Sequence, residues 1–351
     1  MTPPMIRPFA LIAVVTAWLP AQTTVSIPAD RDATLYASTT GNLANGGGSA
    51  MFAGMTGQPQ PRRALLHFDV VGAIPAGAQV LAADLQLTVQ NTSSGLPTPV
   101  FVHLVAQDWS EGTTVAPGGQ GAGGPAQAGD VTWLHTDFPS AFWANPGGDF
   151  APTPSFTMTL PANGAFSSGS LPGLVADVQS FLDTPSGNFG WLIKDDELGA
   201  STAAKVFTRE ASSPSQRPKL SVTYLAPGDT GSWGTGCPTT SPLQLLVTGP
   251  ATSGNTVTLA YGNAPAASIG ATFWSLQLDT VGTPVASGCS LFLGGTIVPG
   301  NAFLTDALGN AGDSFAIPPT SPGFLVVCQG AVLDGSPAGY RLSDGGVMLT
   351  Q

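Results

Sequence analysis

Charged side chains are scarce in this sequence, and basic ones are the scarcest. Only 9% of the 351 residues are Asp, Glu, Lys or Arg, and 21 acidic residues outnumber ten basic ones, which gives a formal net charge of −11. Binding of nucleic acid requires a basic face that neutralises phosphates, so we expect no nucleic-acid partner. The same deficit disfavours unaided binding of acidic polymers.

Residues that commonly carry catalysis are also few. The sequence has three histidines, His67, His103 and His135, and neither a G-x-S-x-G nor an H-E-x-x-H motif. Five carboxylates lie near one another in the sequence: Asp108, Glu111, Asp130, Asp137 and Asp149. A glycosidase needs such a pair, but carboxylates at strand ends commonly accept backbone N–H bonds. We therefore predict that the protein is not an enzyme, and the alternative is a polysaccharide-degrading enzyme.

Cysteine is rare, and all three residues lie in the C-terminal third. Their spacing resembles no zinc site. One disulfide is possible with one thiol left over, and we favour a bond between Cys237 and Cys289. Cys328 lies in the alternating run Phe324-Val326-Cys328, where we expect a buried small hydrophobic residue. A disulfide would fit an exported protein.

The apolar run near the N-terminus is short. Residues 9–19 have the length of a signal-peptide core, and Arg7 is the only charged residue before Asp30. We interpret residues 1–21 as a signal peptide, and a buried strand or an uncleaved anchor are the alternatives. The expected location is secreted or at the cell surface, with no membrane span in the mature chain.

Glycine and proline are abundant, with 45 and 32 residues, and they are not periodic. Between them apolar and polar residues alternate, as in residues 81–90, where Leu85, Leu87 and Val89 share one face. Similar runs occupy residues 64–71, 100–106, 155–160, 190–194 and 219–225. Short strands separated by turn residues predict an all-β chain that begins with a β-sandwich.

One segment has helical periodicity. Its apolar residues are Leu171, Leu174, Val175, Val178, Phe181 and Leu182. Pro185, Ser186 and Gly187 end the pattern. We expect one short helix that caps the sandwich, with Asp177 and Asp183 facing water.

The composition changes after residue 225. Residues 226–236 resemble a linker in composition. No Lys or Arg occurs between Lys219 and Arg341, while alternation continues in residues 256–261, 272–278, 290–293 and 323–329. We predict a first domain over residues 22–225 and a second, smaller β-sandwich domain over residues 237–351.

Two groups of residues are candidates for binding. Asp30, Asp32 and Asn45 precede the glycine run 46–48 and supply the hard oxygen atoms that calcium prefers, so we expect either a structural calcium site or a glycine-rich turn with solvated aspartates. Trp109, Trp133 and Trp143 offer flat apolar faces for sugar rings. Packing of these rings onto the sandwich is the alternative for them.

The few charges are concentrated in residues 188–224. Half of all basic residues lie there: Lys194, Lys205, Arg209, Arg217 and Lys219. Asp195, Asp196, Glu197 and Glu210 accompany them. We expect ion pairs and hydrogen bonds that clamp the last strands of the first domain, with direct ligand contact as the alternative.

The order of several motifs resembles the DNRLRE family, also called carbohydrate-binding module family 96. These motifs are Asp32-Ala33-Thr34-Leu35, Arg62-Arg63-Ala64-Leu65-Leu66-His67-Phe68-Asp69, Trp109-Ser110-Glu111-Gly112, Phe207-Thr208-Arg209-Glu210 and Arg217-Pro218-Lys219-Leu220. The resemblance covers about residues 23–225 and implies a non-catalytic, jelly-roll-like sandwich with polysaccharide binding. The C-terminal region resembles a β domain of secreted planctomycete proteins, on motifs such as Gly288-Cys289-Ser290-Leu291 and Leu342-Ser343-Asp344-Gly345.

Together these features predict an exported, non-catalytic protein that binds a polysaccharide or a cell-surface glycan. The candidate contacts are Trp109, Trp133, Trp143, Arg62 and Arg63, and calcium is the expected cofactor if there is one. A structural protein of the cell envelope or matrix, which recognises protein partners, is the alternative.

Overall fold

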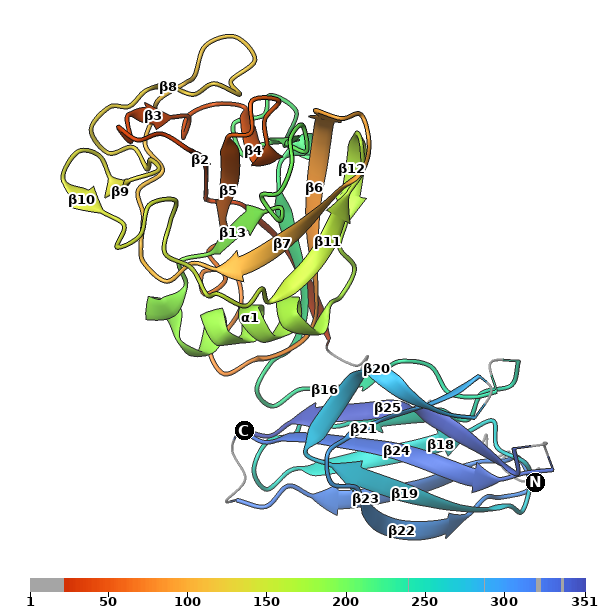
Figure 1. Ribbon diagram of the computed structural model, residues 1–351. Helices are drawn as coiled ribbons and strands as arrows, with labels where there is room; N and C mark the ends of the chain where they lie inside the picture. The colour runs from red at the N-terminus through yellow and green to blue at the C-terminus, as the bar shows by residue number, and fades with distance from the viewer. Residues whose placement is uncertain (1–21, 239, 287, 320–322, 336–337) are drawn as a thin grey trace, which may run out of the picture.

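The chain forms two β-rich parts, as Figure 1 shows. The structure, a computed structural model, describes residues 22–238, 240–286, 288–319, 323–335 and 338–351. The signal-peptide interpretation of residues 1–21 therefore lies outside the described residues. The all-β prediction is confirmed, since α1 (Pro172–Asp183) is the one α-helix of the described part. That part contains no helix long and apolar enough to cross a membrane.

The first part runs to residue 225. Its strands are β1 (Thr23–Pro28), β2 (Arg31–Tyr36), β3 (Leu43–Ala44), β4 (Ala50–Met55), β5 (Pro61–His67), β6 (Gln79–Thr92), β7 (Thr98–Leu104), β8 (Gly124–Pro125), β9 (His135–Asp137), β10 (Ala141–Phe142), β11 (Phe156–Leu160), β12 (Gly164–Ser167), β13 (Trp191–Lys194), β14 (Ala204–Phe207) and β15 (Lys219–Leu225). Two single 3-10 turns accompany them, η1 (Pro185–Gly187) and η2 (Pro214–Gln216).

One large sheet in this part curls into two layers. Its strand order is β1-β15-β6-β14-β4-β5-β13-β7-β11, with β12 beside β6 and β2 beside β5. β4 connects the layers, because residues 50–53 pair with β14 while Gly54 and Met55 pair with β5. The alternating face of β6, with Leu85, Leu87 and Val89, is buried between the layers. The sandwich predicted from this alternation is confirmed.

The helix α1 covers one end of this sandwich (Figure 1). Its apolar residues Leu174, Val178, Phe181 and Leu182 are buried, as the helical spacing predicted. The expectation that Asp177 faces water is wrong, since its side chain is only 6% exposed. Its carboxylate accepts hydrogen bonds from Trp191 Nε1 at 2.7 Å and from the Ser155 hydroxyl at 3.0 Å. A buried indole N–H needs an acceptor, and the helix supplies it from its inner face.

The second part contains β16 (Thr230–Trp233), β17 (Gln244–Thr248), β18 (Thr256–Gly262), β19 (Ile269–Ser275), β20 (Gln277–Ala286), β21 (Cys289–Gly294), β22 (Val298–Leu304), β23 (Ala311–Ala316), β24 (Leu325–Leu333) and β25 (Tyr340–Leu349). A sheet of order β16-β25-β24-β19-β22 faces the three strands β17-β18-β23. Leu245 and Leu259 of the smaller sheet share a core with Val332 and Met348 of the larger one. This part is therefore also a β-sandwich.

Two details of the second part bear on the predictions. Residues 226–236 are not a free linker, because β16 lies within them and pairs with β25. Gly and Ser do not prevent a strand here, since backbone pairing along the edge of a sheet does not require bulky side chains. Cys237 and Cys289 form a disulfide with an S–S distance of 1.99 Å, and Cys328 is free and buried.

An apolar contact joins the two parts. Leu81 and Leu225 of the first part lie in one buried cluster with Val327, Val347 and Leu349 of the second. Side chains at the end of β15 and on β24 and β25 therefore pack directly against one another.

Candidate functional site

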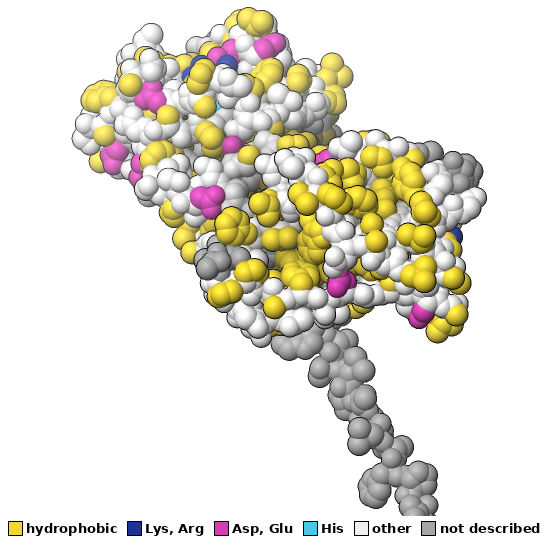
Figure 2. Space-filling view, turned by 90° about the horizontal axis from the view of Figure 1, so that it is seen from below, with side chains coloured by type: hydrophobic (Ala, Val, Ile, Leu, Met, Phe, Trp, Pro, Cys, Tyr) yellow, Lys and Arg dark blue, Asp and Glu magenta, His cyan; other side chains and the backbone are white. Residues whose placement is uncertain are grey.

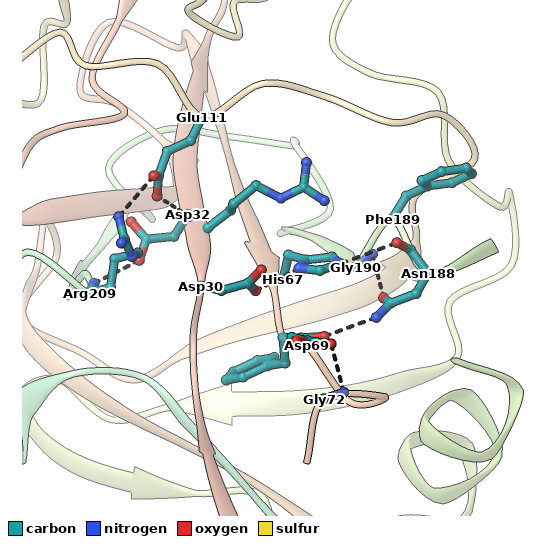
Figure 3. A network of polar contacts seen from close by, with 12 residues as sticks. Asp30, Asp32, His67, Asp69, Gly72, Glu111, Asn188, Phe189, Gly190 and Arg209 are labelled. Carbon is teal, nitrogen blue, oxygen red and sulfur yellow. Dashed lines mark hydrogen bonds and ion pairs between the residues drawn. The ribbon is translucent and has the colours of Figure 1, made fainter. Parts of the chain in front are cut away.

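Three carboxylates from distant segments converge at one edge of the first sandwich. Asp32 lies on β2, Glu111 in the segment between β7 and β8, and Glu210 just after β14. Each contributes a carboxylate oxygen, and these oxygens lie within 4.8 Å of one another. Figure 3 shows Asp32 and Glu111 pointing toward Arg209. We call Asp32, Glu111 and Glu210 the carboxylate cluster.

Hydrogen bonds fix the orientation of this cluster. The Arg209 guanidinium donates to Glu111 Oε2 at 2.9 Å and to Glu210 Oε1 at 2.7 Å. The backbone N–H of Arg209 donates to Asp32 Oδ2 at 2.7 Å, and the backbone N–H of Asp32 donates to Glu111 Oε1 at 2.7 Å. Two buried oxygens, Asp32 Oδ1 and Glu210 Oε2, have no hydrogen-bond partner among the described residues.

Burial dominates the electrostatics of the cluster. It raises the pKa of Asp32 well above its usual range, because loss of water disfavours the charged carboxylate more than the Arg209 N–H favours it. It also raises the pKa of Glu111 to about 7 and that of Glu210 above its ordinary value. Burial therefore favours the protonated form of these carboxyl groups, and the Arg209 guanidinium is the positive group that they share.

The other two residues of the expected calcium site have different partners. Asp30 Oδ1 lies 2.6 Å from His67 Nδ1, and His67 Nε2 lies 3.2 Å from the Asn188 carbonyl oxygen (Figure 3). Although burial opposes it, the His67 hydrogen bond holds the pKa of Asp30 below its usual value. Asn45 donates to the Ala50 carbonyl and accepts the Ala116 N–H at 2.7 Å. Asn45 thus shapes the glycine turn, and only Asp32 of the expected set belongs to the carboxylate cluster.

Two of the three candidate tryptophans are inside the fold. Trp109 and Trp143 are 2% and 5% exposed. Their indole N–H groups donate to the carbonyls of Phe189 at 2.9 Å and Thr132 at 3.0 Å. Both rings lie in one buried apolar cluster with Leu35 and Leu65 of the sheet, as the packing alternative predicts, so they offer no open face to a sugar. Position in a long loop could not reveal this, because a loop side chain can point toward the sheet or toward solvent without any periodic signal in the sequence.

The third tryptophan lines an open cleft of about 770 Å³. Trp133 is half-buried, and the Arg63 guanidinium lies 4.7 Å from the centre of its ring. Arg63 is itself fixed by two bonds to Glu197, at 2.6 and 2.9 Å, and by one to the Gly147 carbonyl. Trp133 therefore has a rigid support before any ligand binds.

Both apolar and polar residues line the rest of this cleft, and four of them are polar. They include the hydroxyl-bearing Ser38 and Thr39, the amide of Gln60 and the guanidinium of Arg62. Arg62 is 5% exposed, stacks over the Tyr36 ring, and donates to the carbonyls of Gly121 and Pro61 and to Gln60 Oε1. Three of the five N–H groups of Arg62 thus donate hydrogen bonds to described residues, and the other two have no acceptor among them.

The charged stretch 188–224 contributes ion pairs both beside the cleft at Trp133 and in the carboxylate cluster. Glu197 pairs with Arg63 and with Lys194, and Arg209 pairs with Glu111 and Glu210. Arg217 donates to the Ala211 carbonyl at 2.8 Å. These contacts hold the segments around β13 and β14 to β5 and to the segment that contains Glu111, as expected of a clamp.

The histidines have local structural partners. His103 Nδ1 lies 2.8 Å from the Ala151 carbonyl oxygen, and His135 Nδ1 lies 2.8 Å from the Thr132 hydroxyl. His135 also packs against the rings of Phe138 and Phe142.

Comparison with known proteins gives no assignment: no protein-family model matches the chain, and a search of the curated proteins finds no match. The DNRLRE family therefore stays a prediction from the sequence motifs.

Proposed function

We propose that this chain is an exported, non-catalytic protein of the DNRLRE kind that binds a polysaccharide or a cell-surface glycan in the cleft beside Trp133. The observation that carries this proposal is the supported indole in an open cleft with hydroxyl, amide and guanidinium groups around it. Sugar-binding sites combine one flat apolar face with a few polar groups of this type. The disulfide between Cys237 and Cys289 supports the export part of the proposal.

Of the five residues first considered for this role, the cleft contains Trp133 and Arg62. Trp133 would stack on a sugar ring, and the two remaining N–H groups of Arg62 would donate to ring hydroxyls or a carboxylate. Arg63 acts as a positioning residue, because its guanidinium covers Trp133 and its own bonds go to Glu197 and Gly147. The residues that line the cleft include one arginine and no carboxylate, so both neutral and acidic glycans should be tested.

A glycan array with neutral and acidic members, probed in the presence of calcium, tests the proposal. The best ligand is then titrated into the wild-type protein and three variants by calorimetry. We expect Trp133→Ala to weaken binding about tenfold, equivalent to about 1.4 kcal/mol, and Gln60→Ala to weaken it less. Phe142→Ala is the matched control, because Phe142 is a 57% exposed ring outside the cleft. Silence across the array, or unchanged affinity in Trp133→Ala, would count against the proposal.

A protein partner is the second candidate, favoured by the apolar surface of the second part. Leu276, Val281 and Leu304 are each more than 60% exposed. Figure 2 shows hydrophobic side chains gathered around a hollow on the face seen from below. Exposed apolar surface is one mark of a protein–protein contact. Retention of the protein in an envelope fraction after complete glycan digestion would favour this candidate over the first.

A further inference from the structure

The carboxylate cluster has the spacing of a cation site. Oxygens of Asp32, Glu111 and Glu210 lie within 4.8 Å of one another. Calcium binds oxygen at about 2.3–2.6 Å, so one ion can contact three oxygens that are this far apart. The three residues come from separate segments, so the fold brings these ligands together.

Two oxygens of the cluster are buried without a partner among the described residues. Asp32 is 0% exposed, and its Oδ2 is held by the Arg209 N–H while its Oδ1 is free. Glu210 repeats this pattern, with Oε1 on the Arg209 guanidinium and Oε2 free. A buried carboxylate oxygen is costly unless something positive or a donor meets it.

The formal charge of the cluster indicates the valence of a cation that it could bind. The cluster contains three carboxylates and one guanidinium, which gives a formal charge of −2 if all are ionised. Arg209 neutralises one carboxylate and also orients two of them. The remaining charge matches one divalent cation.

We propose that Asp32, Glu111 and Glu210 bind one Ca²⁺ ion. Both free oxygens, together with a second lone pair on a Glu111 oxygen, serve as ligands. The side chains of Glu111 and Glu210 are 16% and 22% exposed, so water reaches the cluster from their side and completes the shell. Calcium is favoured over Mg²⁺, because it accepts irregular sets of oxygen ligands and Mg²⁺ demands near-ideal octahedral geometry.

The ion would tie together three segments that Arg209 and the bond from the Asp32 N–H to Glu111 already hold side by side. It would link β2, the segment around Glu111 and the segment after β14. This site is independent of the glycan cleft, since no cluster residue is among those that line the cleft.

Calorimetric titration of CaCl₂ into the EDTA-treated full chain tests the proposal directly. We expect one ion per chain, with a dissociation constant of roughly 0.1–1 mM or tighter. At about 10 mM CaCl₂ the Tm of the first part should rise by about 5–10 °C at the tight end of this range. MgCl₂ at the same concentration should give a smaller rise.

Variants show whether the ion lies in the carboxylate cluster. Asp32→Asn and Glu210→Gln should each lose the calcium-dependent rise in Tm, and Glu210→Gln keeps an oxygen for Arg209. Asp108→Asn is the matched control, because its carboxylate is 68% exposed, lies near Glu111 in the sequence and pairs with Arg31 instead of with the cluster. No heat and no rise in Tm in the wild-type protein would overturn the proposal and leave a proton as the species that the cluster holds. Calcium binding that persists in both variants would also overturn it, by placing the ion elsewhere.

Discussion

The bond between Asp177 and Trp191 supports a sharp prediction about stability. The Trp191 ring is 0% exposed, and its N–H donates to Asp177 at 2.7 Å across the contact between α1 and the sandwich. Replacing Asp177 by Ala leaves this N–H and the Ser155 hydroxyl without their acceptor. An unsatisfied buried donor costs about 1–3 kcal/mol.

The loss of the buried charge acts in the opposite direction and stabilises the Asp177→Ala variant. Burial raises the pKa of Asp177, so the wild-type protein bears a cost for ionising this carboxylate at neutral pH. The Ala variant recovers that cost, and we expect a net loss of about 2 kcal/mol in the free energy of unfolding. In a part of this size, that loss lowers Tm by about 4–8 °C.

Asp177→Asn separates the hydrogen bond from the charge. Asn keeps an acceptor for Trp191 and avoids ionisation, so at pH 7 its stability should equal or exceed that of the wild type. The folded-state pKa of Asp177 lies above its unfolded value, so the wild type loses stability as pH rises through the folded pKa. The advantage of Asn should therefore grow from pH 4 to pH 8.

Differential scanning calorimetry of the full chain measures these effects, with near-UV circular dichroism to report the packing of Trp191. Ser155→Ala is a useful intermediate, since it removes only the 3.0 Å bond and should cost about 1 kcal/mol. The reasoning is refuted if Asp177→Ala unfolds within about 0.5 kcal/mol of the wild type, or if Asn is as harmful as Ala.

Two further predictions concern the second part. Burial raises the pKa of Asp344 to about 6, above its unfolded value. The stability that this residue contributes is therefore full below about pH 4 and falls by at most about 3 kcal/mol as pH rises past 6. Asp344→Asn should flatten the profile of Tm against pH, and an unchanged profile would contradict this. The disulfide closes a loop with a sequence separation of 52. The double variant Cys237→Ser, Cys289→Ser should therefore lose about 4 kcal/mol of its free energy of unfolding, because the unfolded chain gains entropy. Urea unfolding measures this loss, and equal midpoints for the variant and the wild type would contradict the prediction.

The strands and the helix could be predicted because each carries its own periodicity. The run at residues 219–225 coincides with β15, and the helical spacing around Leu174 and Val178 lies within α1. β16 was missed, since Gly and Ser in residues 226–236 gave no alternating pattern, and only the edge of β25 gives that segment a partner.

The candidate sites were harder to predict, because side-chain direction in loops is not periodic. Trp109 and Trp133 look alike in the sequence, yet one is buried and the other lines a cleft. Glu111 and Glu210 lie about 80 and 180 residues from Asp32, and nothing in their spacing places them beside it.

The sequence by itself determined the fold class, the end-capping helix and the scarcity of groups for catalysis, since composition and periodicity are local properties. Only the tertiary structure decided which tryptophan lines a cleft and which carboxylates meet. These depend on how a curled sheet brings distant loops to one edge, where burial sets the charge that each group can hold.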